Sequence, residues 1–115
     1  MLKKVMVMIK SGPEERSNVE KGLRISAAMI GMDYPQNLVF IDRGVECLLP
    51  NVLDDTDIWD YLKAAADLLG IYVLSDSLRE RGLDVDDLNS DLSAIPLDIT
   101  ALSKMSRESD SVIAL

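Results

Sequence analysis

IYVLSDSLRE at positions 71–80 decides the fold of this chain, because an apolar run passes directly into a short charged segment. The apolar residues 71–74 predict a buried strand, and the mixed segment after them predicts a helix. In a parallel α/β sheet, ligands and reactive groups lie just beyond the carboxyl ends of the strands. The junction between Leu74 and Ser75 is therefore the first place where a functional site is expected.

The rest of the chain alternates short apolar runs with amphipathic segments, which is typical of βαβ units with right-handed crossovers. Strands are predicted at 5–9, 38–41, 71–74, near 94–95 and at 112–115. Long helices are predicted at 15–32, 57–69 and 99–107. Thr56 and Gly70 are expected to cap the second of these, with Tyr61 and Leu68 on its buried side. We expect one α/β domain over residues 1–115, a three-layer α/β/α fold with a mainly parallel sheet of about five strands that resembles flavodoxin.

Composition narrows the possible partners. The chain carries a formal net charge of −8, with no histidine and a single cysteine among 115 residues. Nucleic acids and anionic membranes attract proteins chiefly through cationic charge, so neither is an expected partner. No apolar run approaches the roughly 18 residues of a membrane span, and the Met1–Lys4 start passes into a predicted strand instead of a signal peptide. We expect a cytoplasmic protein without a cofactor.

Four segments carry a resemblance to a known family, and they follow one another in the family's order. They are LVFIDRGVECLLP at 38–50, the stretch from 61 to 72, SLRERGLD at 77–84, and DSVIAL at 110–115. Together they resemble the DsrE/DsrF-like (DsrEFH/TusBCD) family of small sulfur-relay proteins, and most closely its DsrF/TusC branch. The resemblance implies the fold predicted above and an oligomeric assembly.

The resemblance also bears on Leu74. Sulfur-carrying members of the family place a cysteine at about this position, a few residues before the Leu-Arg-x-x-Gly stretch that Leu78–Gly82 matches. The resemblance therefore implies that the fold is present and that the family cysteine position is vacated in this chain.

Cys47 is the remaining candidate for sulfur chemistry, because it is the chain's one soft nucleophile. As a thiolate it would carry a persulfide. Against this, the adjacent Glu46 raises the pKa of a thiol, Arg43 offsets part of that effect, and Leu48 and Leu49 indicate packing. We expect a packed structural cysteine, and catalysis by Cys47 stays the alternative.

Polar residues near the predicted strand ends are candidates for lining a small pocket. Ser11 and Gly12 follow the first strand, and Ser75 and Ser77 follow the third. Without a histidine, none of the serines belongs to a catalytic triad. The acidic groups at 54–57 and 84–87 lack the spacing of a calcium loop and are expected to cap helices, so no metal site is predicted.

Three functions agree with these observations. The first is a non-catalytic or assembly subunit of a sulfur-relay complex for tRNA thiolation or sulfur oxidation, as a homo-oligomer or with a DsrE/TusD-like subunit. The second is a sulfurtransferase that uses Cys47. The third is a stand-alone homo-oligomer that binds a small ligand in the vacated pocket. We favour the first, because Leu74 departs from the catalytic pattern.

Overall fold

Five parallel strands form one sheet in the computed structural model, which describes residues 4–54 and 57–115. The strands are β1 (Val5–Ile9), β2 (Gln36–Phe40), β3 (Ile71–Leu74), β4 (Ile95–Leu97) and β5 (Ser111–Ala114). Their order across the sheet is β4-β3-β2-β1-β5, and every pairing is parallel. This confirms the predicted α/β class and extends "mainly parallel" to all of the sheet.

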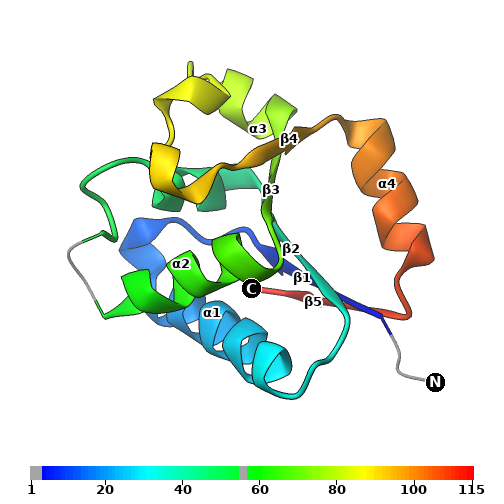
Figure 1. Cartoon of the computed structure of the whole chain (residues 1–115). Coiled ribbons are helices and arrows are strands. Elements are labelled where there is room, and N and C mark those ends of the chain that lie inside the picture. The colour runs from blue at the N-terminus through cyan, green and yellow to red at the C-terminus, as the bar shows by residue number, and fades with distance from the viewer. Residues whose placement is uncertain (1–3, 55–56) are drawn as a thin grey trace.

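Helices cover both faces of the sheet (Figure 1). On one face, α1 (Arg16–Gly31) and α2 (Ile58–Leu68) bury the larger apolar core against alternate residues of β1, β2 and β3. On the other face, α4 (Ile99–Glu108) covers a smaller core in which Leu102 packs with Met6, Val39 and Leu74. The short helix α3 (Ser75–Glu80) directly follows β3. These are the three layers that the sequence predicts.

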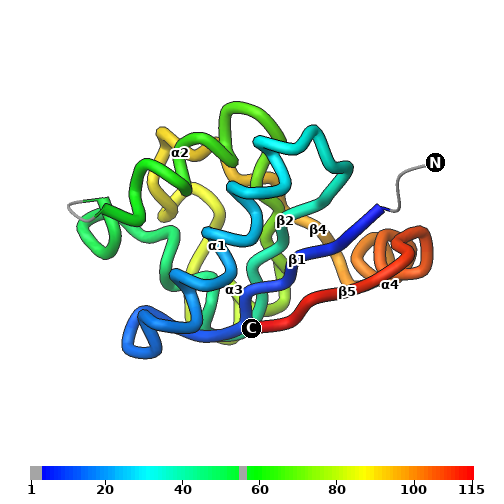
Figure 2. Tube along the Cα trace, turned by 90° about the horizontal axis from the view of Figure 1, so that it is seen from below, coloured from blue at the N-terminus to red at the C-terminus, as the bar shows by residue number. Residues whose placement is uncertain are grey.

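The chain's path explains why α4 lies alone on its face. The chain steps from β1 to β4 in one direction across the sheet and then returns to place β5 on the far side of β1. Right-handed crossovers that run in opposite directions put their helices on opposite faces. Figure 2 shows the result, with β5 along one margin of the sheet and α4 beside it. Counted from β5, the order 5-1-2-3-4 shares flavodoxin's layers but not its order of 2-1-3-4-5.

Two side chains of α2 lie elsewhere than predicted. Tyr61 is 37% exposed and Leu68 is 66% exposed, whereas both were expected on the buried side. The fully buried stripe of α2 consists of Ile58, Leu62 and Ala65. Tyr61 and Leu68 lie at the margin of that stripe, because each successive residue turns by about 100° around the helix axis.

The bounds of several elements also differ from the prediction, each by one or two residues. β2 begins two residues earlier, at Gln36, and ends at Phe40. Its polar first residue is buried because Ser26 Oγ donates to Gln36 Oε1 at 2.9 Å and Gln36 Nε2 donates to the Ser26 carbonyl at 2.8 Å. Thr56, the predicted cap of α2, lies outside the described residues, and Gly70 ends that helix with φ +83°. Among the described helices, none is long and apolar enough to cross a membrane.

Candidate functional site at the carboxyl edge of the sheet

Three segments meet at the carboxyl ends of the central strands. They are the connections that follow β1 and β2, and the helix α3 that follows β3. Residues 10–15 follow β1 and include the 3-10 helix η1 (Pro13–Glu15). The 3-10 helix η2 (Asp42–Leu48) follows β2, contacts η1 on one side, and contacts α3 on the other. All of the site residues predicted from the sequence lie on these segments or at the strand ends that they leave.

Leu74 is the last residue of β3 and directly precedes α3. Its side chain is 8% exposed and packs with Met6, Val39 and Leu102 beneath α4. The position that resemblance assigns to the family cysteine is therefore filled by an apolar side chain that belongs to the smaller core.

Cys47 lies on η2, where its side chain is 1% exposed. Its Sγ–H donates to the carbonyl oxygen of Ser11 at 3.7 Å, which joins η2 to the end of β1. Burial, and secondly the Glu46 carboxylate, raise the pKa of the Cys47 thiol to about 12. At neutral pH the group is therefore a protonated thiol, whereas sulfur chemistry requires the thiolate.

Ser77, on α3, forms a hydrogen bond with the backbone that follows β2. Its side chain is 2% exposed, and its Oγ accepts the Asp42 N–H at 2.8 Å. Asp42 adopts a left-handed conformation with φ +50°, which is uncommon for a residue other than glycine, although aspartate tolerates it better than most. Ser77 thus stabilises a turn, and its hydroxyl is engaged in doing so.

Two arginines at this edge are engaged by carboxylates. Arg81 Nε donates to Glu46 Oε2 at 3.3 Å, and Arg81 Nη1 donates to the Ser77 carbonyl at 3.1 Å. Arg43 forms an ion pair with Glu14 on η1. Positive charge near a thiol favours the thiolate, but here both guanidinium groups are neutralised by acidic side chains.

Of the residues predicted to line a pocket, Ser75 lines a cavity beside α3. This cavity has a volume of about 250 Å³, and Arg79 and Pro96 are also among its lining residues. Ser11, Gly12 and Ser77 do not line it. Ser11 is 6% exposed, and its Oγ accepts from Asn18 Nδ2 at 3.4 Å.

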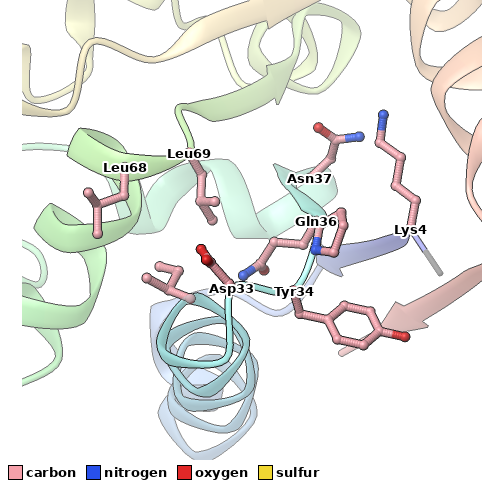
Figure 3. A pocket seen from close by; sticks show the side chains of 9 residues that line it. Lys4, Asp33, Tyr34, Gln36, Asn37, Leu68 and Leu69 are labelled. Carbon is pink, nitrogen blue, oxygen red and sulfur yellow. The ribbon is translucent and has the colours of Figure 1, made fainter. Parts of the chain in front are cut away.

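A cavity of about 630 Å³ lies at the opposite edge of the sheet, where β2 begins and where α1 and α2 end. Figure 3 shows the Lys4 and Asn37 side chains on one side of it and Leu68 and Leu69 on the other. Ligands of α/β sheets bind at the carboxyl ends of strands, whereas this cavity lies at the amino ends. It is not the candidate site.

The acidic group at 84–87 caps a helix as predicted, whereas Asp57, the N-cap residue of α2, makes no side-chain capping hydrogen bond. Asp84 precedes the 3-10 helix η3 (Val85–Asp87) and forms a capping box with Asp87, whose carboxylate accepts the Asp84 N–H at 2.8 Å. Asp54 Oδ2 accepts the Asn51 N–H at 3.1 Å, and Asp55 lies outside the described residues. Within residues 4–54 and 57–115, His, Cys, Asp and Glu side chains form no cluster that could hold a metal ion.

Gly44 is a site residue that sequence reasoning missed. A Cβ at this position would lie 2.2 Å from the Ile9 carbonyl oxygen, so only glycine lets η2 approach the end of β1 this closely. The same carbonyl accepts the Ile41 N–H at 3.0 Å. Gly44 therefore sets how deeply η2, and Cys47 with it, sits against the sheet.

Comparisons with known proteins show a family and two solved structures to which this chain is similar. The sequence profile of the DsrE/DsrF-like family matches residues 3–115. No curated protein matches the chain. Among solved structures, the ychN protein from E. coli is similar at 15% sequence identity and a TM-score of 0.77. MTH1491 from Methanobacterium thermoautotrophicum, a protein of unknown function, is similar at 16% identity and a TM-score of 0.60. Both alignments cover 100% of each chain, and at such identities they establish the fold alone. The profile spans nearly the whole sequence, and the chain therefore belongs to the DsrE/DsrF-like family.

Proposed function

We propose that this chain is a non-catalytic subunit of a sulfur-relay assembly in which another protein supplies the sulfur-carrying cysteine. Membership of the DsrE/DsrF-like family supports a role related to sulfur relay. The observation that carries the proposal is the state of the chain's one thiol, which is 1% exposed and has its pKa raised to about 12. A sulfur carrier must present a thiolate to its donor and acceptor, and Cys47 is neither accessible nor ionised.

Leu74 supports the same proposal from the other candidate position. Its side chain is an integral part of the core beneath α4. A polar or reactive group there would be enclosed by Met6, Val39 and Leu102. The chain's contribution to a relay would then be structural, through the surface that it offers to other subunits.

The finer parts of the proposal rest on the sequence resemblance. Segments 38–50 and 77–84 favour the DsrF/TusC branch, so a DsrE/TusD-like protein is the partner that would carry sulfur. The pathway would be tRNA thiolation or sulfur oxidation, in the cytoplasm. A sulfurtransferase that uses Cys47 is the alternative, and it would require η2 to leave the position that Ser11 and Gly44 hold.

An assembly subunit should not remain a monomer. Several large apolar side chains are exposed on the described surface, including Ile99 at 54%, Val112 at 44% and Ile95 at 42%, and association would cover such groups. We expect sedimentation equilibrium at micromolar concentration to give a mass that is a multiple of 12.7 kDa. A single 12.7 kDa species over the whole concentration range would contradict self-assembly.

A further inference from the structure

The cavity of about 630 Å³ at the amino edge of the sheet lies apart from the candidate site. The register of the strands explains why it forms. β3 begins opposite Leu38, so Gln36 and Asn37 of β2 extend past the start of the neighbouring strand. The last turns of α1 and α2 border this gap, and the α2 side contributes Leu68 and Leu69. A volume of this size suits a small organic ligand.

Three residues that line this cavity depart from what their local structure prefers. Asp33 follows α1 with φ +57°, in the left-handed conformation that glycine usually supplies after a helix. Gln36 is polar but only 8% exposed, and Leu68 is apolar but 66% exposed. Each departure costs stability, and such departures gather at functional sites. The cavity therefore has features expected of a binding site.

Two polar groups of the cavity are free to contact a ligand. The Gln36 amide oxygen accepts from Ser26 Oγ at 2.9 Å, and Nε2 donates to the Ser26 carbonyl at 2.8 Å, which fixes the amide in one orientation. Within residues 4–54 and 57–115, the second Nε2 hydrogen of Gln36 has no partner. The Asp33 carboxylate likewise makes no hydrogen bond or ion pair with the described residues, and Figure 3 shows it on the same side of the cavity as Leu69. The cavity thus offers one amide donor and one negative charge.

A positive charge lies on the other side of the cavity. The Lys4 backbone N–H donates to the Asp110 carboxylate at 2.8 Å, which ties the start of β1 to the segment before β5. The Lys4 ammonium group forms no ion pair with any described residue. Figure 3 shows the Lys4 and Asn37 side chains extending to the same side, away from Asp33. The cavity therefore presents opposite charges on its two sides, with the Asn37 amide on the positive side.

We propose that this cavity binds a small zwitterion with an apolar body, and that a dipeptide of apolar residues is the class that fits. The ammonium group of the ligand pairs with the Asp33 carboxylate, and its apolar side chains cover Leu68 and Leu69. The peptide carbonyl accepts the free Nε2 hydrogen of Gln36, and the ligand carboxylate is drawn to Lys4. Because the two charges of the cavity lie on opposite sides, a dipeptide fits better than a single amino acid, whose ammonium and carboxylate groups share one carbon atom. The site uses no sulfur chemistry, so the inference goes beyond the proposed function.

The first test titrates isotope-labelled protein with leucyl-leucine and follows the backbone amide resonances by NMR. We expect saturable shifts at residues that line the cavity, such as Ile30, Asn37 and Leu69. N-acetyl-leucyl-leucine lacks the ammonium group and leucyl-leucine amide lacks the carboxylate. Each should bind about tenfold more weakly or worse, which is the scale for losing one hydrogen bond to a charged group. Leucine should also bind more weakly than the dipeptide.

The second test matches each charge of the ligand to one side chain. Asp33→Asn keeps the size of the side chain and its tolerance of the left-handed conformation, so it should weaken leucyl-leucine about tenfold and leave the binding of N-acetyl-leucyl-leucine unchanged. Lys4→Met should weaken leucyl-leucine and leave the binding of leucyl-leucine amide unchanged. Asp86→Asn is the matched control, because it removes an exposed carboxylate that does not line the cavity, and it should bind like the parent.

The proposal is overturned if leucyl-leucine causes no saturable shifts at the cavity, or if the parent binds N-acetyl-leucyl-leucine as tightly as leucyl-leucine. Equal effects of Asp33→Asn and Asp86→Asn on leucyl-leucine binding would also overturn it. If a variant does not fold, the comparison of the ligands on the parent chain decides. Cys47 takes no part in these measurements, so the cavity site and the non-catalytic role fail separately.

Discussion

Cys47 in the folded protein should react with iodoacetamide about 1,000-fold more slowly near neutral pH than in the urea-unfolded chain. The thiolate is the reacting species, and each unit of pKa changes its population about tenfold. Folding raises the pKa of this thiol from the ordinary 9.0 to about 12, and the burial that causes most of the rise also restricts access. The rates can be measured by mass spectrometry of the alkylated protein.

The pH dependence of the alkylation rate distinguishes the two causes of slow reaction, which are protonation of the Cys47 thiol and restricted access of the reagent to it. Because the folded pKa is raised, the alkylation rate of the folded chain should keep rising well above pH 9.0, whereas that of the unfolded chain should level off there. An exposed thiol at Ile95→Cys in a Cys47→Ser background should react at an ordinary rate and so verify the reagent. A folded-state rate within tenfold of the unfolded rate would show that η2 opens readily.

Gly44→Ala should lower the free energy of unfolding by about 3 kcal/mol or more, at or above the upper end of the range for overpacked sites. The added Cβ would lie 2.2 Å from the Ile9 carbonyl oxygen, and that atom is backbone of a central strand that cannot move aside. A small domain is stable by roughly 5–15 kcal/mol, so the loss is a large share of the total. Urea unfolding followed by circular dichroism gives the value.

Gly31→Ala is the matched control. An added Cβ there meets nothing within 4 Å, and Gly31 is the last residue of α1, so the preference of helix interiors for alanine over glycine applies only in part. We expect a neutral or slightly stabilised protein. Where the Gly44→Ala variant still folds, η2 is displaced from β1 and Cys47 should alkylate faster. Equal stability of the two variants would mean that η2 does not pack against Ile9 as described.

The fold could be predicted from the sequence because its central strands have unambiguous patterns. VMVMI at 5–9 and IYVL at 71–74 are continuous apolar runs, as strands covered on both faces require, and both have the predicted bounds. The start of β2 could not be predicted, because Gln36 is polar and its burial depends on Ser26, ten residues away on α1. Tyr61 and Leu68 satisfy the helical repeat, and only the position of α2 on the sheet shows that they lie outside its buried stripe.

The candidate site was predictable in its location but not in its contacts. The neighbours Leu48 and Leu49 and the carboxylate of Glu46 already indicated a packed and protonated Cys47. The partner of Cys47 is the Ser11 carbonyl, 36 positions earlier, and the partner of Ser77 is the Asp42 N–H, 35 positions earlier. Contacts of that range depend on how the connecting segments meet, which local patterns do not contain. The need for glycine at position 44 was missed for the same reason, because it arises from the close approach of η2 to the Ile9 carbonyl.

Sulfur loading of the intact folded chain tests the central claim most directly. The protein would be incubated with inorganic polysulfide near neutral pH, desalted, and weighed by intact mass spectrometry, with Cys47→Ser as the matched control. We expect the folded protein to keep its unmodified mass, because its one thiol is buried and protonated, while the urea-unfolded chain gains sulfur. A folded chain that gains a sulfur atom, loses it to dithiothreitol, and fails to gain it when Cys47 is serine would contradict the account and establish Cys47 as a persulfide carrier.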